Sequence, residues 1–406
     1  MDGSGPLGLK SFMANPDATF ATKEGRIKFC QDCLEQGYLD LAVRELMKGL
    51  NLFPDDPDLY FFLGVALDEK GHRDQAIEYY QHCLEINPEH SEARCNLGAD
   101  LHALGRKEEA RAAYEQAVRH NDVLPEAHFN LGTLYFDQQD FSRAEAEFSQ
   151  ALALQADAAQ AHYWLGLTRA QLGRPEEAME SLGMAVGADP RFADAYFNLG
   201  VLLDDAGRRE EALEAYLTCL DLDPAHDWAQ QNLVALYSAK GMLKEAVASA
   251  RESLRRVPDD IERMATLGSL LVEEGSLDQA TELFLKALEL SPDYARAHYQ
   301  LGLLFLKQGL AKKASREFEK ALEKDPNSAK SHYNLGVLYE QQGQRPLALD
   351  AYKEALRLKP DFREAHFNLA LAYYEDGQKD LAQAQARNLQ ALDPSLAREL
   401  AGHLKD

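Results

Sequence analysis

Six asparagines recur along the chain at spacings of 34 residues or a multiple of 34, and they are the first candidates for ligand contact. They are Asn96, Asn130, Asn198, Asn232, Asn334 and Asn368. Each amide offers N–H donors and a carbonyl acceptor, so a column of them can hydrogen-bond the backbone of an extended peptide. Asparagine is a mediocre helix former, which makes its recurrence inside expected helices informative. The alternative is that each asparagine braces or caps a neighbouring repeat.

A second column is aromatic and stands one residue before the asparagine positions. Its members are Phe61, Phe129, Tyr163, Phe197, Tyr299, Tyr333 and Phe367. Such rings can receive the side chains of a ligand or pack within the protein, and both alternatives stay open. Trp164 and Thr266 stand where an asparagine would continue the first column, so they interrupt a single unbroken peptide track.

Charged residues flank the two columns, and their sign changes along the chain. Acidic residues come first, at Asp58, Glu69, Glu92, Glu126, Asp137, Asp194 and Asp205, and basic residues follow at Arg296, Lys307 and Lys330. We expect the acidic part to favour basic partner segments. The alternative is that these charges only keep the surface solvated.

The sequence gives little support to chemistry other than binding. Cys30-x-x-Cys33 has no second pair, and both cysteines fall at positions expected to be buried, so we interpret them as core residues. Histidine also recurs, at His128, His162, His298, His332 and His366. Successive histidines lie at least one repeat apart, about 10 Å or more, too far to share a metal ion, so packing is the better interpretation. Since no phosphate-binding loop, nucleophile elbow or HExxH motif is present, we expect no enzyme activity, cofactor or metal site.

All these positions belong to one 34-residue period, which begins at Lys23 and continues without insertion for eleven rows to Leu396. Place 8 of a row is small, most often glycine as in Gly64, and place 24 is usually aromatic, as in Tyr80. Place 20 is alanine in every row. Place 15 is usually glycine, and place 32 is mostly proline, as in Pro88.

This period predicts a helix–turn–helix unit. Small residues at places 8 and 20 let two helices approach closely, and the ring at place 24 fills the space at their crossing. Glycine at place 15 ends the first helix, and proline at place 32 stops the second. Asp74, Ser142 and Asp278 at place 18 suit the start of the second helix. On a helical wheel, places 4, 7, 8 and 11 of the first helix face the partner helices, and places 2, 5, 6, 9, 12 and 13 form the opposite side.

The seventh row, residues 227–260, departs from the pattern. Val234 replaces the small residue at place 8, Ala250 replaces the ring at place 24, and Trp228 stands at place 2. Loss of a buried ring costs about 3–5 kcal/mol when nothing compensates, so we expect this row to be the weak joint of the array. Val234 should fill part of the space.

These residues resemble the tetratricopeptide-repeat family over nearly the whole chain. Residues 195–200 (Ala-Tyr-Phe-Asn-Leu-Gly) and 331–336 (Ser-His-Tyr-Asn-Leu-Gly) are very similar to the first-helix signature of that family. The resemblance implies an all-α, right-handed superhelical solenoid of eleven tandem repeats over residues 23–396. Its first helices would line a concave groove, which places 2, 5 and 6 would face, and residues 397–406 would form a C-terminal capping helix.

The asparagine column resembles the ladder in the superhelical repeat region of O-linked N-acetylglucosamine transferases. The carboxylate clamp of co-chaperone members is absent, because place 5 is mainly aromatic where the clamp needs lysine.

Composition narrows the partners. The 406 residues carry a formal net charge of −24, which disfavours nucleic acid and anionic lipid. No apolar run approaches the roughly 20 residues that span a bilayer. An odd number of cysteines, five, and the lack of a visible secretory signal lead us to expect a cytoplasmic protein. Residues 1–22 are expected to be a disordered tail or a segment left by expression cloning.

Three functions stay open. The first is a non-catalytic module that binds extended or disordered polypeptide segments in its groove. The second is an assembly scaffold that docks folded partners, or copies of itself, through outer and edge surfaces. The third is the regulatory repeat part of a glycosyltransferase-like system.

Overall fold

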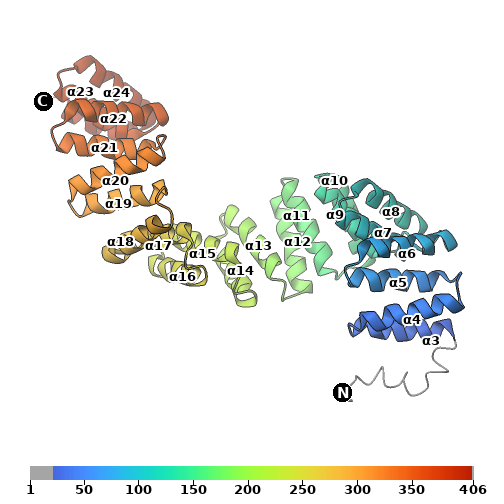
Figure 1. Cartoon of the computed structure of the whole chain (residues 1–406). Helices are drawn as coiled ribbons and strands as arrows, with labels where there is room; N and C mark the ends of the chain where they lie inside the picture. The colour runs from blue at the N-terminus through green and yellow to red at the C-terminus, as the bar shows by residue number, and fades with distance from the viewer. Residues whose placement is uncertain (1–21, 405–406) are drawn as a thin grey trace. The chain divides into compact units, whose positions relative to one another are not determined.

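The structure is a computed structural model that describes residues 22–404, and within this range it contains twenty-three α-helices and no strand (Figure 1). The first helices of the rows are α3 (Lys23–Glu35), α5 (Pro57–Glu69), α7 (Ser91–Ala103), α9 (Pro125–Asp137), α11 (Ala159–Gln171), α13 (Ala193–Asp205), α15 (Asp227–Ala239), α17 (Ile261–Glu274), α19 (Ala295–Lys307), α21 (Ala329–Gln341) and α23 (Arg363–Glu375). The second helices are α4 (Leu39–Leu52), α6 (Arg73–Ile86), α8 (Lys107–His120), α10 (Phe141–Leu154), α12 (Pro175–Ala188), α14 (Arg209–Leu222), α16 (Leu243–Arg256), α18 (Leu277–Leu290), α20 (Ala311–Lys324), α22 (Arg345–Leu358) and α24 (Lys379–Leu392). The predicted all-α repeat class is confirmed.

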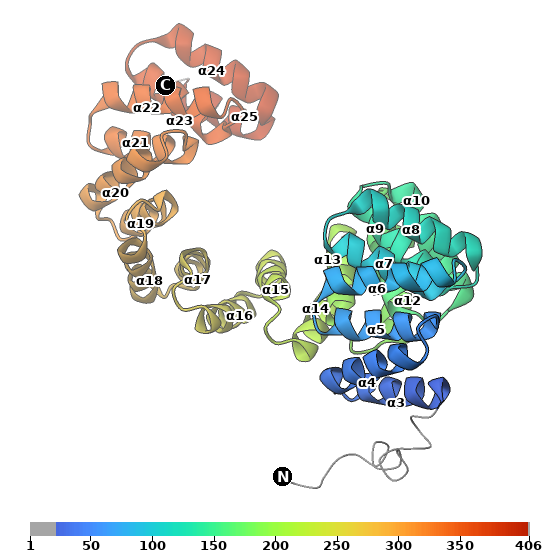
Figure 2. The same ribbon diagram turned by 45° about the vertical axis from the view of Figure 1, so that its right-hand side comes forward.

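The helices form two compact units that meet in sequence between Pro224 and Ala225. The first unit contains α3 to α14, and the second contains α15 to α25. In both views, each first helix within a unit lies beside its own second helix (Figures 1 and 2). The division falls near the end of the sixth row, although the 34-residue period runs through it without a change.

The last helix, α25 (Pro394–His403), packs on α23 and α24 in the second unit (Figure 2). It begins inside the row that was expected to end at Leu396. Asp393 caps it by accepting hydrogen bonds from the backbone N–H groups of Ser395 and Leu396, each at 3.0 Å. No helix within residues 22–404 has the length and apolar character needed to cross a membrane.

The expected tail, residues 1–22, lies outside the described residues except for Thr22. The Thr22 hydroxyl accepts a hydrogen bond from the backbone N–H of Gly25 at 3.2 Å and so caps α3.

In seven of the eleven rows the helix pair is held by a ring that lies directly on the backbone of the first helix. A β-carbon placed on Gly64 would come within 2.5 Å of Tyr80 Cε1, and one on Gly336 within 2.6 Å of Tyr352 Cε1. Only glycine permits this approach, because real carbon contacts are longer. The alanines at place 20 are at most 1% exposed in all eleven rows. The predicted roles of places 8, 20 and 24 are therefore confirmed as packing roles.

The first helix buries a wider stripe than the wheel predicted. Places 3 and 10 are buried as well, as Ala127 and Leu134 show with 0% exposure each. A first helix packs on the second helix of the preceding row as well as on its own partner, and the wheel of a single pair does not include that contact.

The prediction that Asp74, Ser142 and Asp278 start the second helices was wrong in its mechanism. Each is the second residue of its helix, because the second helices begin at place 17 and their capping residue stands at place 16. There, Asp140 accepts a hydrogen bond from Arg143 N at 3.3 Å. Acidic residues in the first turn instead stabilise the helix, because their negative charge interacts with the positive end of the helix dipole.

Buried cysteines and histidines serve packing, as predicted. Cys30 and Cys33 are 0% exposed, and burial raises the pKa of their thiols to about 12 and about 11. His298 Nε2 donates to the carbonyl of Pro292 at 3.3 Å, while its Nδ1 lies 2.7 Å from Glu317 Oε2 on the second helix. The histidines at place 4 thus tie the loop between rows to the first helix, and some of them also tie the two helices of a row.

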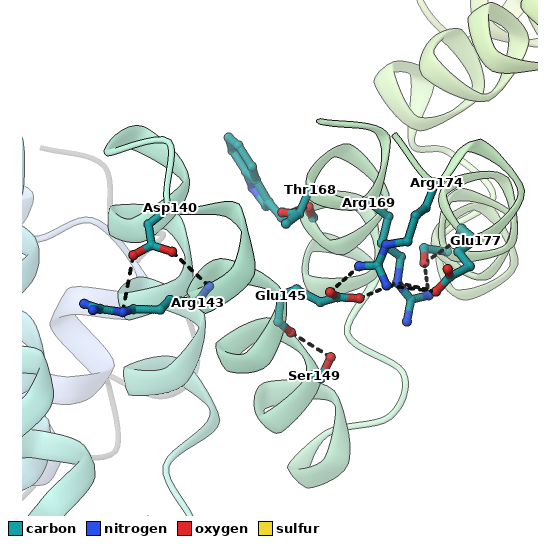
Figure 3. A network of polar contacts seen from close by, with 10 residues as sticks. Asp140, Arg143, Glu145, Ser149, Thr168, Arg169, Arg174 and Glu177 are labelled. Carbon is teal, nitrogen blue, oxygen red and sulfur yellow. Dashed lines mark hydrogen bonds and ion pairs between the residues drawn. The ribbon is translucent and has the colours of Figure 1, made fainter. Parts of the chain in front are cut away.

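A polar network links the fourth and fifth rows (Figure 3). Glu145 on α10 accepts hydrogen bonds from Arg169 Nε at 3.1 Å and from Arg174. Arg169 also donates to Ser181 Oγ at 2.8 Å. Burial opposes the charge on Glu145, but hydrogen bonds from Arg174 and Arg169 outweigh it and hold the pKa of this carboxyl below its usual range. The network joins α10 to both helices of the next row.

The turn after the first helix provides a test of local strain. Ten of the eleven turns have glycine at place 15 with positive φ, such as 77° at Gly105, but the fourth row has Gln139 with φ 61°. A left-handed conformation costs a residue with a β-carbon about 1–2 kcal/mol. We predict that Gln139→Gly stabilises the protein by about 1 kcal/mol in urea unfolding, and that Gly105→Gln in the preceding turn destabilises it by a similar amount. Equal stability of the wild type and Gln139→Gly would contradict the strain.

Candidate functional site

We call the exposed side formed by places 2, 5, 6, 9, 12 and 13 of the first helices the first-helix face. The charged candidates at places 2 and 13 lie on it, and all are exposed except the half-exposed Asp58. The asparagine and aromatic candidates are half-buried, because part of each side chain packs against neighbouring helices. The face divides between the units: candidates up to Asp205 belong to the first unit, and those from Trp228 onward belong to the second.

The place-5 rings are partly packed against the core. The centroid of Phe61 lies 6.2 Å from that of Tyr80, and the centroid of Tyr333 lies 6.0 Å from that of Tyr352, so place 5 leans on the ring at place 24 of its own row. Phe129, Phe197 and Tyr299 make the same contact. One side of each ring therefore belongs to the core, and the other belongs to the face.

Four asparagines of the column donate hydrogen bonds to the place-5 residue of the preceding row. Asn198 Nδ2 donates to Tyr163 Oη at 3.3 Å, Asn334 Nδ2 to Tyr299 Oη at 3.5 Å, and Asn368 Nδ2 to Tyr333 Oη at 3.1 Å. Asn130 Nδ2 donates to Cys95 Sγ at 3.4 Å. These bonds connect consecutive rows, so the asparagines do brace neighbouring repeats.

The remaining donor capacity is limited. Asn198 Nδ2 also donates to the carbonyl of Asp194 at 2.8 Å, and Asn334 Nδ2 to the carbonyl of Lys330 at 3.0 Å. Each amide nitrogen carries two N–H groups, so both are used within the protein at these two asparagines. A peptide lying here would meet the carbonyl oxygen of the amide, which accepts a backbone N–H.

Three cavities open between consecutive rows on the first-helix face. Each is lined by places 5, 27 and 34 of one row and by places 2 and 3 of the next. Their volumes are about 180 Å³ in the fourth row, about 290 Å³ in the seventh and about 370 Å³ in the ninth. The predicted face residues Phe129, Tyr299 and Lys330 take part in these walls.

The residue at place 34 differs between the rows with these cavities and three rows in which a ring covers place 5. In the rows with cavities it is Ala158, Asp260 or Ser328. In the second, fifth and tenth rows it is a ring that packs on place 5, with centroid distances of 4.8 Å, 4.8 Å and 4.9 Å for Phe61–His90, Tyr163–Phe192 and Tyr333–Phe362. Sequence reasoning did not single out place 34, although its variation between small and aromatic residues carried the signal.

The charges on the face are partly paired. Arg296 Nη1 lies 2.8 Å from Glu262 Oε2, and Lys307 Nζ donates to the carbonyl of Val272 at 3.2 Å. In the first unit, His102 Nε2 lies 3.0 Å from Asp137 Oδ2. Bonds of this kind run between rows along the face, so they also brace the array. Among residues 22–404, no group of three or more His, Cys, Asp or Glu side chains is placed to hold a metal ion.

Sequence reasoning missed a buried acid beside the face. Asp100, at place 10 of α7, is 2% exposed, and Arg73 Nε lies 3.5 Å from its Oδ1. Burial, followed by the hydrogen bond with Asp68 and the charge of that neighbour, raises the pKa of Asp100 to about 7, although Arg73 opposes the shift. Asp100 therefore holds a proton over much of the acidic range.

Models of known families match most of the chain. The model of the "Cilia and flagella-associated protein 70 C-terminal domain" matches residues 90–301. Two "Tetratricopeptide repeat" models match the flanking rows, one over residues 57–90 and the other over residues 299–361 and 333–397. A comparison with curated proteins gives no match.

Solved structures of repeat proteins are similar to parts of the chain. MamA is 26% identical over 40% of this chain and 95% of its own, with a TM-score of 0.38. YrrB, described as "a TPR protein with an unusual peptide-binding site", is 28% identical over 46% of this chain and 96% of its own, with a TM-score of 0.37. The Cut9–Hcn1 hetero-tetramer of the APC/C is 14% identical over 98% of this chain and 99% of its own, with a TM-score of 0.49.

The protonation of Asp100 predicts a pH dependence of stability. Because its folded pKa is raised above the ordinary value near 3.8, the folded state binds the proton more tightly, and stability falls as pH rises from about 4 through about 7. We predict that Asp100→Asn stabilises the chain by about 1–3 kcal/mol at pH 8 and by clearly less at pH 5, measured by urea unfolding. The exposed Glu126→Gln serves as the control and should change stability by less than about 0.5 kcal/mol at either pH. A gain from Asp100→Asn that is equal at both pH values would refute the assignment.

Proposed function

Because this chain belongs to the tetratricopeptide-repeat family represented by the C-terminal domain of cilia and flagella-associated protein 70, we propose that it is a non-catalytic module that binds extended polypeptide segments along its first-helix face. The repeated cavities between rows are the observation that carries the proposal. They recur at equivalent places, in the fourth row of the first unit and in the seventh and ninth rows of the second, and each can receive a side chain of an extended ligand.

The chemistry of the face supports this ligand class. Half-buried rings offer apolar area with little loss of side-chain freedom, and asparagine carbonyl oxygens can accept peptide N–H groups. A hydrogen bond nets only about 0.5–1.5 kcal/mol, and ordering a peptide residue costs about 1–2 kcal/mol, so burial against the rings and in the cavities has to supply the affinity.

Charge adds a preference in the first unit. Glu92, Glu126 and Asp194 are exposed on its face, which favours basic segments at rows two to six. Single exposed pairs contribute about 0–1 kcal/mol each, so this preference requires several of them together. We expect the chain to act in the cytoplasm.

A second candidate function is a scaffold that docks folded partners on the opposite side. A hollow of about 760 Å³ lies between α16, α17 and α18 and includes Leu254 and Leu283 among basic side chains. The charged side chains of its lining are Arg251, Arg255, Lys286 and Glu282, and their net charge is positive, so an acidic apolar surface of a folded partner, or of another copy, would fit it.

Two matched triple variants separate bracing from binding. Replacing Asn198, Asn334 and Asn368 with Ala removes both the inter-row hydrogen bonds and the amide oxygens that would contact the ligand. Replacing Tyr163, Tyr299 and Tyr333 with Phe removes the same three hydrogen bonds and keeps the asparagine amides. The ligand is a peptide enriched on the purified chain from a displayed pool of unstructured 16-residue sequences.

We predict that the alanine triple variant weakens peptide binding at least tenfold, while the phenylalanine triple variant changes it less than threefold. Both should lower the melting temperature, because each loses three inter-row hydrogen bonds. If both sets destabilise the protein equally and neither alters affinity, the asparagines are braces only and the proposed role of the column is wrong.

A further inference from the structure

We infer that the seventh repeat contains a recognition pocket for one aromatic side chain of a bound polypeptide. The assignment rests on the proposed function, since it places the ligand on the first-helix face, and it adds a specificity that the other repeats lack. The pocket is the cavity of about 290 Å³ between α15, α16 and α17.

The pocket reaches farther into the repeat than the cavities of the fourth and ninth rows, because this repeat lacks its ring: places 8 and 24 line it, and they do not line the other two cavities. In the eighth row, Phe284 at place 24 is 0% exposed and lies on Gly268. In the seventh row, place 24 is Ala250 and place 8 is Val234, and both line the cavity. Val234 replaces only part of the volume of a ring, and the cavity extends from the face to the buried side chains at these two places.

The eleventh row shows that a missing ring does not by itself leave a pocket. Its places 8 and 24 are Ala370 and Ala386, both small. There, Leu389 and Leu400 pack with these alanines, and Leu400 comes from α25, the added terminal helix. The chain fills the eleventh row from within, whereas the seventh row keeps its cavity accessible.

The walls fit a ring. Val234, Ala235 and Ala250 supply apolar surface, and Ser238, Ser253 and Thr266 add small polar groups. A dry apolar cavity of about 150 Å³ is enough to bind benzene, so the larger space here accommodates a phenylalanine or tyrosine side chain. A ligand ring would supply the aromatic group that the row lacks.

The charged groups at the mouth are fixed by the protein. Arg263 Nη2 lies 2.5 Å from Asp227 Oδ2, and Arg263 Nη1 donates to the carbonyl of Ser253 at 2.9 Å. Asp260 accepts hydrogen bonds from the backbone of α17. Glu262, the remaining charged residue of the lining, lies 2.8 Å from Arg296 Nη1. Since these groups already have partners, the pocket selects for shape and apolar character rather than for charge.

Trp228 marks the same surface. It stands one helical turn before Gln231, which lines the cavity, and its side chain is 67% exposed. No other large hydrophobic side chain within residues 22–404 is more exposed. Tryptophan is strongly enriched among residues that dominate binding energy, so Trp228 provides a contact for the ligand backbone next to the pocket.

Fluorine NMR tests the pocket directly. The full chain contains only two tryptophans, Trp164 and Trp228, so labelling with 5-fluorotryptophan gives two signals, assigned with Trp228→Phe. The probes are capped pentapeptides Gly-Gly-Phe-Gly-Gly and Gly-Gly-Ala-Gly-Gly. We expect the phenylalanine peptide to shift the Trp228 signal saturably, with at least tenfold tighter binding than the alanine peptide, while the Trp164 signal stays in place.

Variants that fill or enlarge the pocket provide the controls. Val234→Gly with Ala250→Phe restores the pair found in other rows, fills the pocket from within and should weaken binding of the phenylalanine peptide at least tenfold. Val234→Gly alone enlarges the pocket and should keep binding, although it destabilises the row. Ala235→Phe, at an exposed position, covers the mouth without changing the core and should also weaken binding.

Equal binding of the two peptides, no saturable shift of Trp228, or unchanged affinity in both blocking variants would overturn the pocket. These outcomes are separate from those of the asparagine and tyrosine triple variants. The first-helix face can bind peptides with this pocket unused, and the pentapeptide can bind here even if the asparagine column only braces the array.

Discussion

The contact between a large side chain at place 24 and a first-helix residue without a β-carbon at place 8 sets the geometry of the protein. It brings the two helices of a row together, and it gives each pair a shape on which the next pair can stack. The glycine turn, the place-20 alanine and the inter-row hydrogen bonds all depend on that spacing. One pair cannot bury its own apolar stripe, so stability is shared between neighbouring rows.

Rows that depart from this contact show how the space between the two helices of a row is filled when the ring is absent. In the fifth row the ring becomes Leu182, which lies on Gly166 where a β-carbon would be 2.8 Å from Leu182 Cγ. In the eleventh row the space is taken by side chains that include a residue of α25. In the seventh row the two substituted side chains, Val234 and Ala250, line a cavity. The chain thus combines one packing rule with variations in the fifth, seventh and eleventh rows, and the variation in the seventh row adjoins that cavity.

The helical period allowed the fold to be predicted because place 8, place 20 and place 24 report contacts within one repeat. Burial at places 3 and 10 was missed because it arises from contact with the preceding row, which a wheel for one pair does not contain. Asp100 illustrates the consequence: it was not singled out from the sequence, and stacking places it at 2% exposure. The division between Pro224 and Ala225 likewise has no counterpart in the period.

The candidate site was predicted in part. The asparagine and aromatic places do lie together on one face, but the two alternatives given for each were not exclusive. Asn198 uses both amide N–H groups within the protein and keeps a carbonyl oxygen, so bracing leaves only that oxygen for the proposed ligand contact. Place 34 was missed because its role, closing a cavity between two rows, becomes visible only when consecutive rows are stacked.

Photo-crosslinking tests most directly whether the first-helix face is the binding surface. Benzoylphenylalanine is introduced singly at exposed first-helix positions, Glu126 and Lys330, and at exposed second-helix positions, Glu180 and Glu282. Each variant is irradiated with polypeptide partners from a cell extract, and the adducts are quantified by mass spectrometry. The account predicts at least tenfold more adduct at Glu126 and Lys330 than at the other two positions. Adducts that are equal at all four positions, or that concentrate at Glu180 and Glu282, would contradict it and favour a scaffold that binds through its outer surface.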